Sequence, residues 1–328
     1  MRTAFIEELC LLAERDERIW LVCGDLGYSV LEAFSNRFPG RYLNAGVAEQ
    51  NMTGIAAGLA LAGKTVFTYS IANFPVMRCL EQIRNDVCYH NLNVKIVSVG
   101  GGLAYGSHGY THHGVEDIAV MSAMPNMMVV APGDPVEARA ATAALAGSPG
   151  PAYLRLGKAG EKLLHRRPID FEIGKAIQVE DGRDITLIST GGMLETALEA
   201  AELLRDKKYS VRLLSMPTLV PLDVEAVGQA AMETHALLTI EEHGVGGLGA
   251  LVAEVLAEGG TGIRFHAVRL GRAPIKVAGT QRQLREAQGL SAVAIAIAAE
   301  KLFNRMGPGS KWKALDEDIV ALEPSSRQ

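Results

Sequence analysis

The sequence predicts an α/β protein built from two doubly wound domains in succession. Short apolar segments alternate with helical segments of about 10–15 residues, a pattern typical of a parallel sheet with helices on both faces. The alternation loosens in the middle of the chain and then starts again. The length of 328 residues fits two domains at roughly 150 residues each. We expect domains at 1–160 and 184–304, a linker at 161–183 and a polar tail at 305–328.

The elements of the first domain follow from apolar periodicity and from glycine and proline breaks. Residues 3–15 have the spacing of an amphipathic helix, with Ile6, Leu9 and Leu12 on its apolar side. Pro39-Gly40 ends the next helix. After that first helix we expect, in chain order, strand 19–26, helix 30–38, strand 41–44, strand 65–69, helix 74–88, strand 94–99, a glycine-rich loop at 100–109, helix 114–124, strand 127–131, helix 135–146 and strand 152–156.

The second domain repeats the alternation after a stretch of scattered charges at 157–182, which indicates a linker or an edge segment. Pro217 and Pro221 exclude a regular helix from the segment MPTLVPLD. The expected elements are strand 184–189, helix 193–207, strand 211–215, helix 224–231, strand 236–241, helix 250–258, strand 265–269 and helix 290–303.

The composition is that of an ordinary globular protein, with 48% hydrophobic and 21% charged residues and a formal net charge of −5. No cluster of basic residues interleaved with aromatics occurs, which argues against a nucleic-acid-binding surface. No apolar run approaches the roughly 18 residues that span a bilayer, and we do not expect the acidic, helical N-terminus to be a secretory signal. The four cysteines form no CxxC pair, so we expect reduced thiols in a cytoplasmic protein.

The segment NAGVAEQNMTGIAAGLALAG at 44–63 has a single acidic residue, Glu49, followed by small and apolar residues. A helix without a charged face is predicted to be buried on most sides, and its small residues allow other elements to approach closely. Glu49 has two interpretations. It is a negative charge that favours the positive end of the helix dipole, or it has a chemical role that explains its isolation.

Gly244–Gly249 matches the dinucleotide-binding pattern G-x-G-x-x-G and lies between a strand and a helix. However, it follows a late strand of the second domain, and the next strand ends in Arg269 instead of an acidic residue. A tight structural loop is therefore favoured over a nicotinamide or flavin site.

Three histidines and one phenylalanine have competing interpretations. His108, His112 and His113 could ligate zinc, but no cysteine lies nearby and glycines surround them. Because a loop after a parallel strand points to the carboxyl edge of the sheet, a substrate-binding loop is favoured. Phe74, taken alone, fits core packing better than an aromatic platform for a flat heterocycle.

Four segments carry a family resemblance when they are taken together. They are GDLG at 24–27, NAGVAEQNMTGIAAGLA at 44–60, FPVMRCLEQIRND at 74–86 and GYTHHGVEDIAVMSAMPNMMVVAPGDPVEA at 109–138. Their order and spacing resemble the C-terminal half of the thiamin-diphosphate-dependent transketolase family, which includes deoxyxylulose-phosphate synthases and the β subunits of 2-oxoacid dehydrogenases. The resemblance covers about residues 1–300. It implies a pyrimidine-binding domain of the thiamin-diphosphate fold at 1–160, followed by a transketolase C-terminal-like α/β domain.

The resemblance implies roles for particular residues. Glu49 corresponds to the glutamate that contacts N1′ of the cofactor's aminopyrimidine, and in an apolar setting the neutral form of this carboxyl is favoured. It can then share a proton with the ring, while the thiazolium ring acts as the electron sink. Phe74 becomes the stacking partner of the pyrimidine. The resemblance further assigns cofactor binding to Asp25 and Val47, catalysis to His112 with Glu49, and substrate binding to His108, His112, His113, Arg78 and Lys158, the last in a place where relatives often carry an arginine for the substrate phosphate.

One departure from the family concerns the cofactor. Relatives hold the diphosphate through magnesium with a GDG motif and a downstream asparagine, and this motif is missing from the chain. The resemblance therefore implies the C-terminal subunit of a split transketolase. An N-terminal subunit carrying GDG and Asn would bind Mg²⁺, and active sites would form at the interface of an α2β2 assembly. The helix after Glu49 would be a close-packed seam between subunits.

A second departure concerns the substrate. Relatives carry an acidic residue before Thr-His, where this chain has Ser107-His108-Gly109-Tyr110, and a histidine that is replaced here within Gly100–Gly102. Those positions read sugar hydroxyls in typical transketolases. We expect transfer of a two-carbon ketol unit from a ketose or ketose phosphate to an aldose. The alternatives are a decarboxylating enzyme like deoxyxylulose-phosphate synthase or a 2-oxoacid dehydrogenase β subunit, a nicotinamide-dependent dehydrogenase, and a non-catalytic scaffold.

Overall fold

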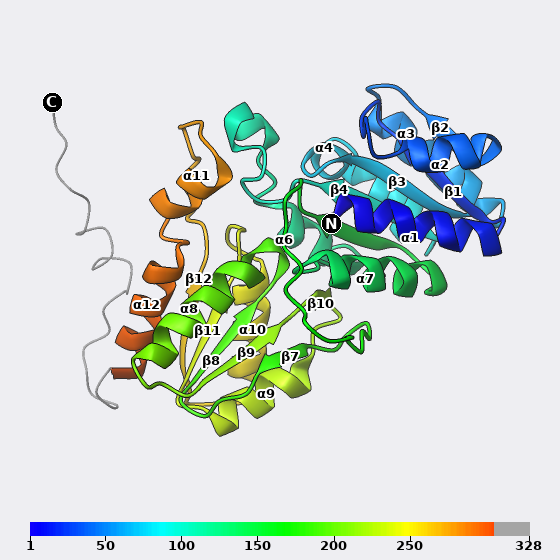
Figure 1. Cartoon of the computed structure of the whole chain (residues 1–328). Helices are drawn as coiled ribbons and strands as arrows, with labels where there is room; N and C mark the ends of the chain where they lie inside the picture. Colours follow the sequence, from blue (N-terminus) through cyan, green and yellow to red (C-terminus); the bar gives the residue numbers. More distant parts are fainter. Residues whose placement is uncertain (305–328) are drawn as a thin grey trace, which may run out of the picture.

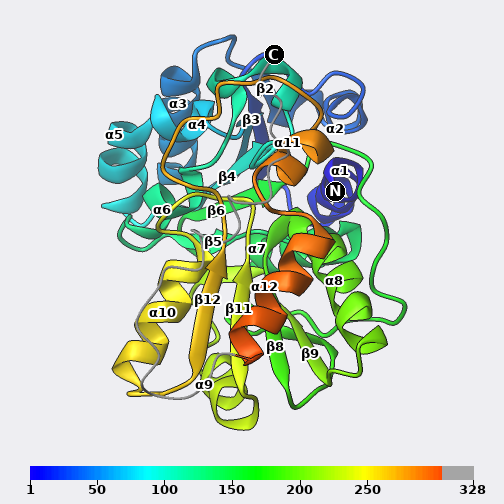
Figure 2. The same ribbon diagram turned by 90° about the vertical axis from the view of Figure 1, so that its left-hand side faces the viewer.

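The computed structural model describes residues 1–304, and the expected polar tail at 305–328 lies outside the described residues. Within the described part the strands form two sheets, and Figure 2 shows the first sheet above the second, each with helices on both faces. The predicted pair of doubly wound α/β sheets is confirmed. In this same part, the helices are too short or too polar to cross a bilayer.

The first sheet is mainly parallel, and its central strands are buried on both faces. In β3, for example, all residues but the last are buried, as expected of a strand covered by helices on both sides. Within residues 1–304 its strands are, in sheet order, β10 (Thr218–Val220), β5 (Met128–Val130), β6 (Ala152–Leu156), β4 (Val94–Val99), β3 (Thr65–Ile71), β1 (Ile19–Cys23) and β2 (Tyr42–Asn44).

Two groups of helices cover this sheet. One face packs against α1 (Arg2–Arg15), α2 (Glu32–Arg37) and α7 (Pro135–Gly147), whose buried residues share one apolar cluster with the strands. The opposite face packs against α3 (Glu49–Leu61), α4 (Phe74–Met77) and α6 (Asp117–Ser122). Helix α7 starts where the sequence favours it, because Pro135 occupies the first turn and the side chain of Asp134 accepts a hydrogen bond from the Glu137 amide.

The prediction of a single helix over 74–88 is wrong. Helix α4 ends at Met77, a short α5 (Leu80–Gln82) follows, and residues Ile83–Cys88 form a π-helix. The break lies at Cys79, whose φ of −109° is outside the helical region. Pattern reading misses such a break because the apolar spacing continues across it. π-helical turns are frequent at functional sites, and this one follows Arg78 closely.

The second sheet repeats the architecture. Within residues 1–304 its strands are, in sheet order, β12 (Arg264–Val268), β11 (Ala236–Ile240), β8 (Ile185–Ser189), β9 (Val211–Ser215) and β7 (Ile177–Glu180). Figure 2 shows α8 (Leu194–Asp206) and α12 (Ala292–Asn304) on one face, with α9 (Val224–Glu233) and α10 (Leu248–Glu258) on the other.

Two strands and one helix were not expected from the sequence. Strand β7 lies in the segment interpreted as a linker or edge, and it pairs antiparallel with β9 at the sheet edge. Strand β10, from the proline-flanked segment, pairs antiparallel with β5 and so extends the first sheet, an edge position that neighbouring prolines tolerate. Helix α11 (Gln281–Ala287) begins with a capping box at Thr280. The second half therefore completes the sheet of the first half.

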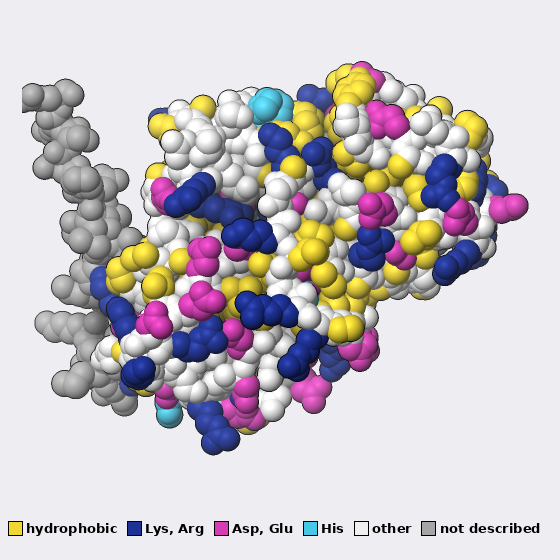
Figure 3. All heavy atoms as spheres, viewed as in Figure 1, with side chains coloured by type: hydrophobic (Ala, Val, Ile, Leu, Met, Phe, Trp, Pro, Cys, Tyr) yellow, Lys and Arg dark blue, Asp and Glu magenta, His cyan; other side chains and the backbone are white. Residues whose placement is uncertain are grey.

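On the face drawn in Figure 3, basic and acidic side chains of the described residues are interspersed over both halves. This distribution agrees with the small net charge of the sequence. That face therefore has no single-sign field of the kind that attracts nucleic acid.

The segment after β6 is fastened to the start of α7 by Asp134, Glu137 and His165. Asp134 accepts hydrogen bonds from the amides of Leu164 (2.8 Å) and His165 (3.2 Å). The Nε2 atom of His165 lies 2.7 Å from Glu137 Oε1, and both side chains are buried. One possible metal-ligand atom from each of the three side chains lies within 4.8 Å of the other two, a spacing that could hold a metal ion. Because the carboxylates already accept amide and imidazole hydrogen bonds, we interpret the cluster as a structural latch.

We expect replacement of His165 by glutamine to destabilise the protein mainly at low pH. Burial lowers the pKa of His165, but the hydrogen bond and charge of Glu137 outweigh it and raise that pKa above its ordinary value. A raised folded-state pKa gives stability that is fully present below the unfolded-state pKa and is lost as pH rises through the folded-state pKa. The expected loss is about 1.5–3 kcal/mol of unfolding free energy below about pH 6, and less at pH 8.

Urea denaturation at both pH values measures this difference. The control is His90→Gln, because His90 is exposed and its ring contacts that of the neighbouring Tyr89. An equal loss of stability by His165→Gln at the two pH values would contradict the charged latch.

Candidate functional site

The candidate site lies along the carboxyl edge of the first sheet. Strands β6, β4, β3 and β1 are neighbours in that order. The sequence-predicted residues follow them directly, with Lys158 after β6, the histidine loop after β4, Phe74 after β3 and Asp25 after β1. Ligands of open α/β sheets bind outside the carboxyl ends of the strands. The fold thus brings segments that are far apart in sequence onto one edge.

Glu49 is the first residue of α3 and is 2% exposed. Its Oε1 accepts a hydrogen bond from Ser70 Oγ at 3.2 Å, and its Oε2 lies 3.0 Å from Nη1 of Arg78. The expected apolar setting is therefore wrong, because a serine and an arginine partner the carboxylate. Gly24 leaves room beside it, since a Cβ there would lie 3.5 Å from both Glu49 Cγ and Ser70 Oγ.

Helix α3 is buried on one face only. Met52, Thr53, Ala56 and Ala57 face the interior, whereas Leu61 is 69% exposed. Gly54 and Gly58 are also exposed, and nothing in residues 1–304 would meet a Cβ at either position. The expectation of burial on most sides is wrong for this chain by itself. Small residues at an exposed helix face leave room for a close neighbour.

Arg78 and Phe74 link Glu49 to the histidine loop. The guanidinium carbon of Arg78 lies 4.9 Å from the centroid of the Phe74 ring, within the range of a cation–π contact. The Phe74 ring in turn contacts the ring of His112 edge-on, at 5.2 Å. The Arg78 side chain is 52% exposed, and Phe74 is half-buried. Phe74 is thus at the edge of the site, with contacts on two sides.

The remaining members of the site gather around Tyr105. The Lys158 Nζ atom lies 4.6 Å from the centroid of the Tyr105 ring, and the ring of His108 contacts it edge-on at 5.6 Å. The rings of His108 and His112 are 4.9 Å apart. Burial lowers the pKa of His112, and the neighbouring His108 lowers it further. The His112 imidazole is therefore neutral at pH 7 and can both donate and accept a hydrogen bond.

His113 is separated from the other two histidines. It is 2% exposed, and its ring contacts Tyr110. It lines a cavity of about 210 Å³ together with Glu116 and residues 270–275 of the second domain. Both ring nitrogens are without a hydrogen-bond partner in residues 1–304. Burial lowers the pKa of His113. The structure gives this histidine no ring contact with the group around Phe74 and Tyr105 among the described residues.

Asp25 and Val47 lie at the far end of the edge, next to β2. Asp25 has a φ of +58°, a conformation that is uncommon for residues other than glycine, and accepts a hydrogen bond from Asn44 Nδ2 at 2.9 Å. Asp25 is exposed, and Val47 is 72% exposed. Backbone strain of this kind clusters at functional sites.

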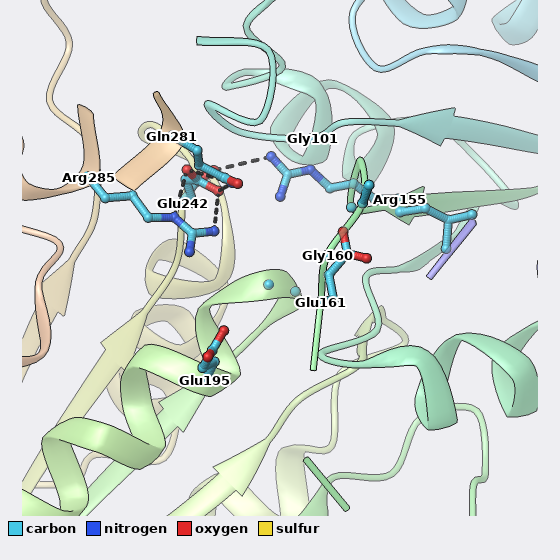
Figure 4. A pocket seen from close by; sticks show the side chains of 13 residues that line it. Gly101, Arg155, Gly160, Glu161, Glu195, Glu242, Gln281 and Arg285 are labelled. Atoms are coloured by element: carbon cyan, nitrogen blue, oxygen red, sulfur yellow. Dashed lines mark hydrogen bonds and ion pairs between the residues drawn. The ribbon is translucent and has the colours of Figure 1, made fainter. Parts of the chain in front are cut away.

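A buried ionic network fixes the histidine loop to the second domain. Asp117 Oδ2 accepts hydrogen bonds from Arg155 Nε at 2.7 Å and from Tyr153 Oη at 2.5 Å. The Nη2 atom of Arg155 also donates to the carbonyl oxygens of Gly114 and Glu242. Figure 4 shows Arg155 reaching toward Glu242 across a cavity of about 110 Å³ between the two halves. The network therefore anchors the end of the loop that carries His112.

The second domain also supports the middle of this loop. The amide of Gly279 donates to the Gly106 carbonyl oxygen at 3.2 Å, and a Cβ at Gly106 would overlap Gly279 and Leu284. Figure 1 shows α11 beside the loop that follows β4. The ends of the loop are joined by the backbone pair of Gly102 and Gly114.

The dinucleotide-like motif at 244–249 forms a closed structural loop. The carboxylate of Glu241 accepts hydrogen bonds from the amides of Leu248 and Gly249, both at 2.8 Å. These amides start α10, where a bound phosphate would otherwise be expected. Because a carboxylate of the chain already occupies that position, the structure supports the interpretation as a tight loop.

Sequence reasoning missed four residues that build this region. Arg155 is a charged residue within an otherwise apolar, fully buried strand, a signal that could have indicated its role. Asp117 follows the histidine motif and is completely buried. Ser70 and Tyr105 give no comparable signal, because their contacts arise only when distant segments meet.

Comparison with known proteins identifies the class. Residues 1–160 match the transketolase pyrimidine-binding domain, and residues 174–295 match the transketolase C-terminal domain. The chain belongs to the transketolase family. More particularly, it falls among the C-terminal subunits of split transketolases, and thiamin diphosphate is the cofactor of this family.

Three similar proteins illustrate this placement. One subunit of an apulose-4-phosphate transketolase from Phocaeicola vulgatus is 41% identical, over 80% of this chain and 86% of its own length. A putative transketolase C-terminal section from Methanocaldococcus jannaschii is 40% identical, over 79% of this chain and 83% of its own. The solved structure of a split gene transketolase, described as an inactive beta4 tetramer, is 36% identical with a TM-score of 0.83 and covers 92% of this chain and 97% of that one.

Proposed function

We propose that this chain is the pyrimidine-side subunit of a split transketolase that transfers a two-carbon ketol unit from a ketose or ketose phosphate to an aldose. The observation that carries the proposal is the buried carboxylate of Glu49 at the carboxyl edge. Arg78 pairs with this carboxylate and also contacts the ring of Phe74. We also propose the division into domains at 1–160 and 184–304, joined by the segment 161–183, whose strand β7 already pairs in the second sheet. Strand β10 then crosses from the second domain to the first sheet.

The residues present suit the pyrimidine end of thiamin diphosphate. Glu49 is a buried carboxyl whose partners are Ser70 and the half-exposed Arg78, so one oxygen becomes free when Arg78 turns aside. Phe74 offers an aromatic face, and Asp25 and Val47 border the same edge. When bound, thiamin diphosphate supplies an electron sink for the transferred unit. The part of this chain is to hold the pyrimidine and to move a proton at the Glu49 carboxyl.

The substrate end of the site has donors suited to a sugar with an acidic group. His112 is neutral and lies between Phe74 and His108, where it can exchange hydrogen bonds with hydroxyls. Lys158 and Arg78 supply positive charge at either side. Relatives include transketolase subunits named for apulose 4-phosphate and for 6-deoxy-6-sulfo-D-fructose, both anionic sugars. We propose His108, His112, Lys158 and Arg78 as substrate-binding residues. His113 is not among them, because it lines the cavity beside Glu116.

The diphosphate and Mg²⁺ would be held by a partner subunit that carries the GDG and asparagine motif. The exposed small-residue face of α3, with Gly54, Gly58 and Leu61, suits a subunit contact beside Glu49. Active sites at such a contact fit an α2β2 assembly. The buried, unpaired thiols of all four cysteines suit a reducing, cytoplasmic location.

Reconstitution with the partner tests this function. We expect the chain alone to be inactive, and the mixture with the N-terminal subunit, thiamin diphosphate and Mg²⁺ to transfer a ketol unit from a ketose. Chromatography of the products measures the transfer. Pyruvate as donor is the matched control, because release of carbon dioxide would indicate the decarboxylating alternative. Equal activity without the cofactor would contradict the proposal.

A further inference from the structure

Gly100, at the end of β4, leaves space that the aromatic ring of Tyr105 occupies. Gly100 follows β4 with a φ of +77°, and a Cβ at that position would overlap the ring of Tyr105. Any side chain at residue 100 is therefore excluded by both backbone and space. The ring of Tyr105 instead lies against the strand end, half-buried at the carboxyl edge.

Tyr105 touches three of the polar side chains of the site. The ammonium group of Lys158 lies over the face of its ring at 4.6 Å. The rings of His108 and His112 lie at 5.6 Å and 6.2 Å from it. These three partners come from two different strand ends, β6 and β4, so Tyr105 is the side chain that joins them.

No carboxylate of the described residues neutralises the ammonium group of Lys158. Its contact partner is the Tyr105 ring. A cation held on a ring face keeps its charge for a further anion, because the ring supplies attraction without neutralising it. Burial raises the pKa of Tyr105, so its phenol stays uncharged at neutral pH.

We propose that Tyr105 is a specificity-determining residue that holds Lys158 in place for the terminal anionic group of a ketose. The inference rests on the proposed ketol transfer and names the residue that selects an acidic sugar over a neutral one. The ring face does this, and the hydroxyl group is not required. Tyr105 therefore acts through Lys158 and is a positioning residue for the substrate's anion.

The test compares two donors in the reconstituted enzyme, xylulose 5-phosphate and unphosphorylated xylulose. Replacing Tyr105 with leucine removes the cation–π contact and keeps an apolar side chain at the position. We expect KM for the phosphorylated donor to rise about 3- to 30-fold, with kcat and the KM for xylulose little changed. The matched control is Tyr105→Phe, which keeps the ring and is expected to stay close to the wild type for both donors.

A double-mutant cycle separates this role from simple packing. Once Lys158 is replaced by methionine, Tyr105→Leu is expected to cause no further loss of preference for the phosphorylated donor. Equal effects of Tyr105→Leu on both donors, or additive effects in the cycle, would overturn the proposal. Circular dichroism of Tyr105→Leu and Tyr105→Phe checks that both variants fold.

A binding measurement keeps the inference separate from the proposed function. If no donor is turned over by the wild type, ketol transfer fails, but calorimetric titration of the same complex with inorganic phosphate still tests Tyr105. We expect phosphate binding to weaken about 3- to 30-fold in Tyr105→Leu and in Lys158→Met alike. Unchanged phosphate affinity in Tyr105→Leu, with Lys158→Met weakened, would refute the role of the ring.

Discussion

Replacing Glu49 with glutamine is expected to reduce turnover of the reconstituted enzyme by about two to four orders of magnitude, while thiamin diphosphate still binds. The substitution keeps the size of the side chain and its hydrogen bond with Ser70. It removes the group that can gain and lose a proton, and proton transfer is the role proposed for this buried residue. Donor consumption measures turnover, and calorimetry of the assembled complex measures cofactor binding.

The matched control is Glu81→Gln, because Glu81 is an exposed glutamate on the same side of the sheet, in α5. We expect this variant to keep its activity. Full activity in Glu49→Gln would contradict the assignment. Loss of cofactor binding together with activity would instead indicate that Glu49 holds the pyrimidine without moving a proton.

Replacing Asp117 with alanine is expected to lower the free energy of unfolding by about 3–5 kcal/mol. Asp117 is fully buried, and it neutralises Arg155, which is 6% exposed. Without its partner, the Arg155 guanidinium is a buried charge that has lost its counter-ion, and Tyr153 loses the acceptor of its hydroxyl group. Urea denaturation of the variant, followed by circular dichroism, measures the change.

The double variant Asp117→Leu with Arg155→Met separates charge from packing. Removing both charges leaves no unpaired ion, so we expect it to be more stable than Asp117→Ala alone. We expect the activity of the double variant to be lower than that of the wild type, because Arg155 also holds the Gly114 end of the histidine loop. A loss below about 1 kcal/mol in Asp117→Ala would contradict the importance of the pair.

Much of the fold was predictable because its elements are local. The alternation of apolar strands with helices indicated both sheets and their mainly parallel pairing, as is found between β3 and β4. The errors occurred where local pattern is weak. The break at Cys79 and the π-helix after it interrupt a segment whose apolar spacing continues. Strand β10 is short, and its pairing with β5 depends on contact between the two halves.

The candidate site was predictable only in part. Glu49 is conspicuous in sequence because it is the single charge before an apolar helix, and Phe74 and the histidines were found by their order along the chain. The polar partners of Glu49, Ser70 and Arg78, were not expected. Ser70 belongs to β3, and Arg78 lies between the end of α4 and the helix break at Cys79.

The sequence by itself determined the two-domain α/β class, the family and the isolated carboxylate, because periodicity, glycine breaks and ordered motifs are properties of the chain in one dimension. Tertiary structure alone decided that His113 lies apart from His108 and His112, how Tyr105 fills the space at Gly100, and that Arg155 is neutralised by Asp117. Such contacts join the ends of different strands. Their geometry depends on how the strands are ordered and aligned in the sheet, and residue spacing along the chain does not contain that information.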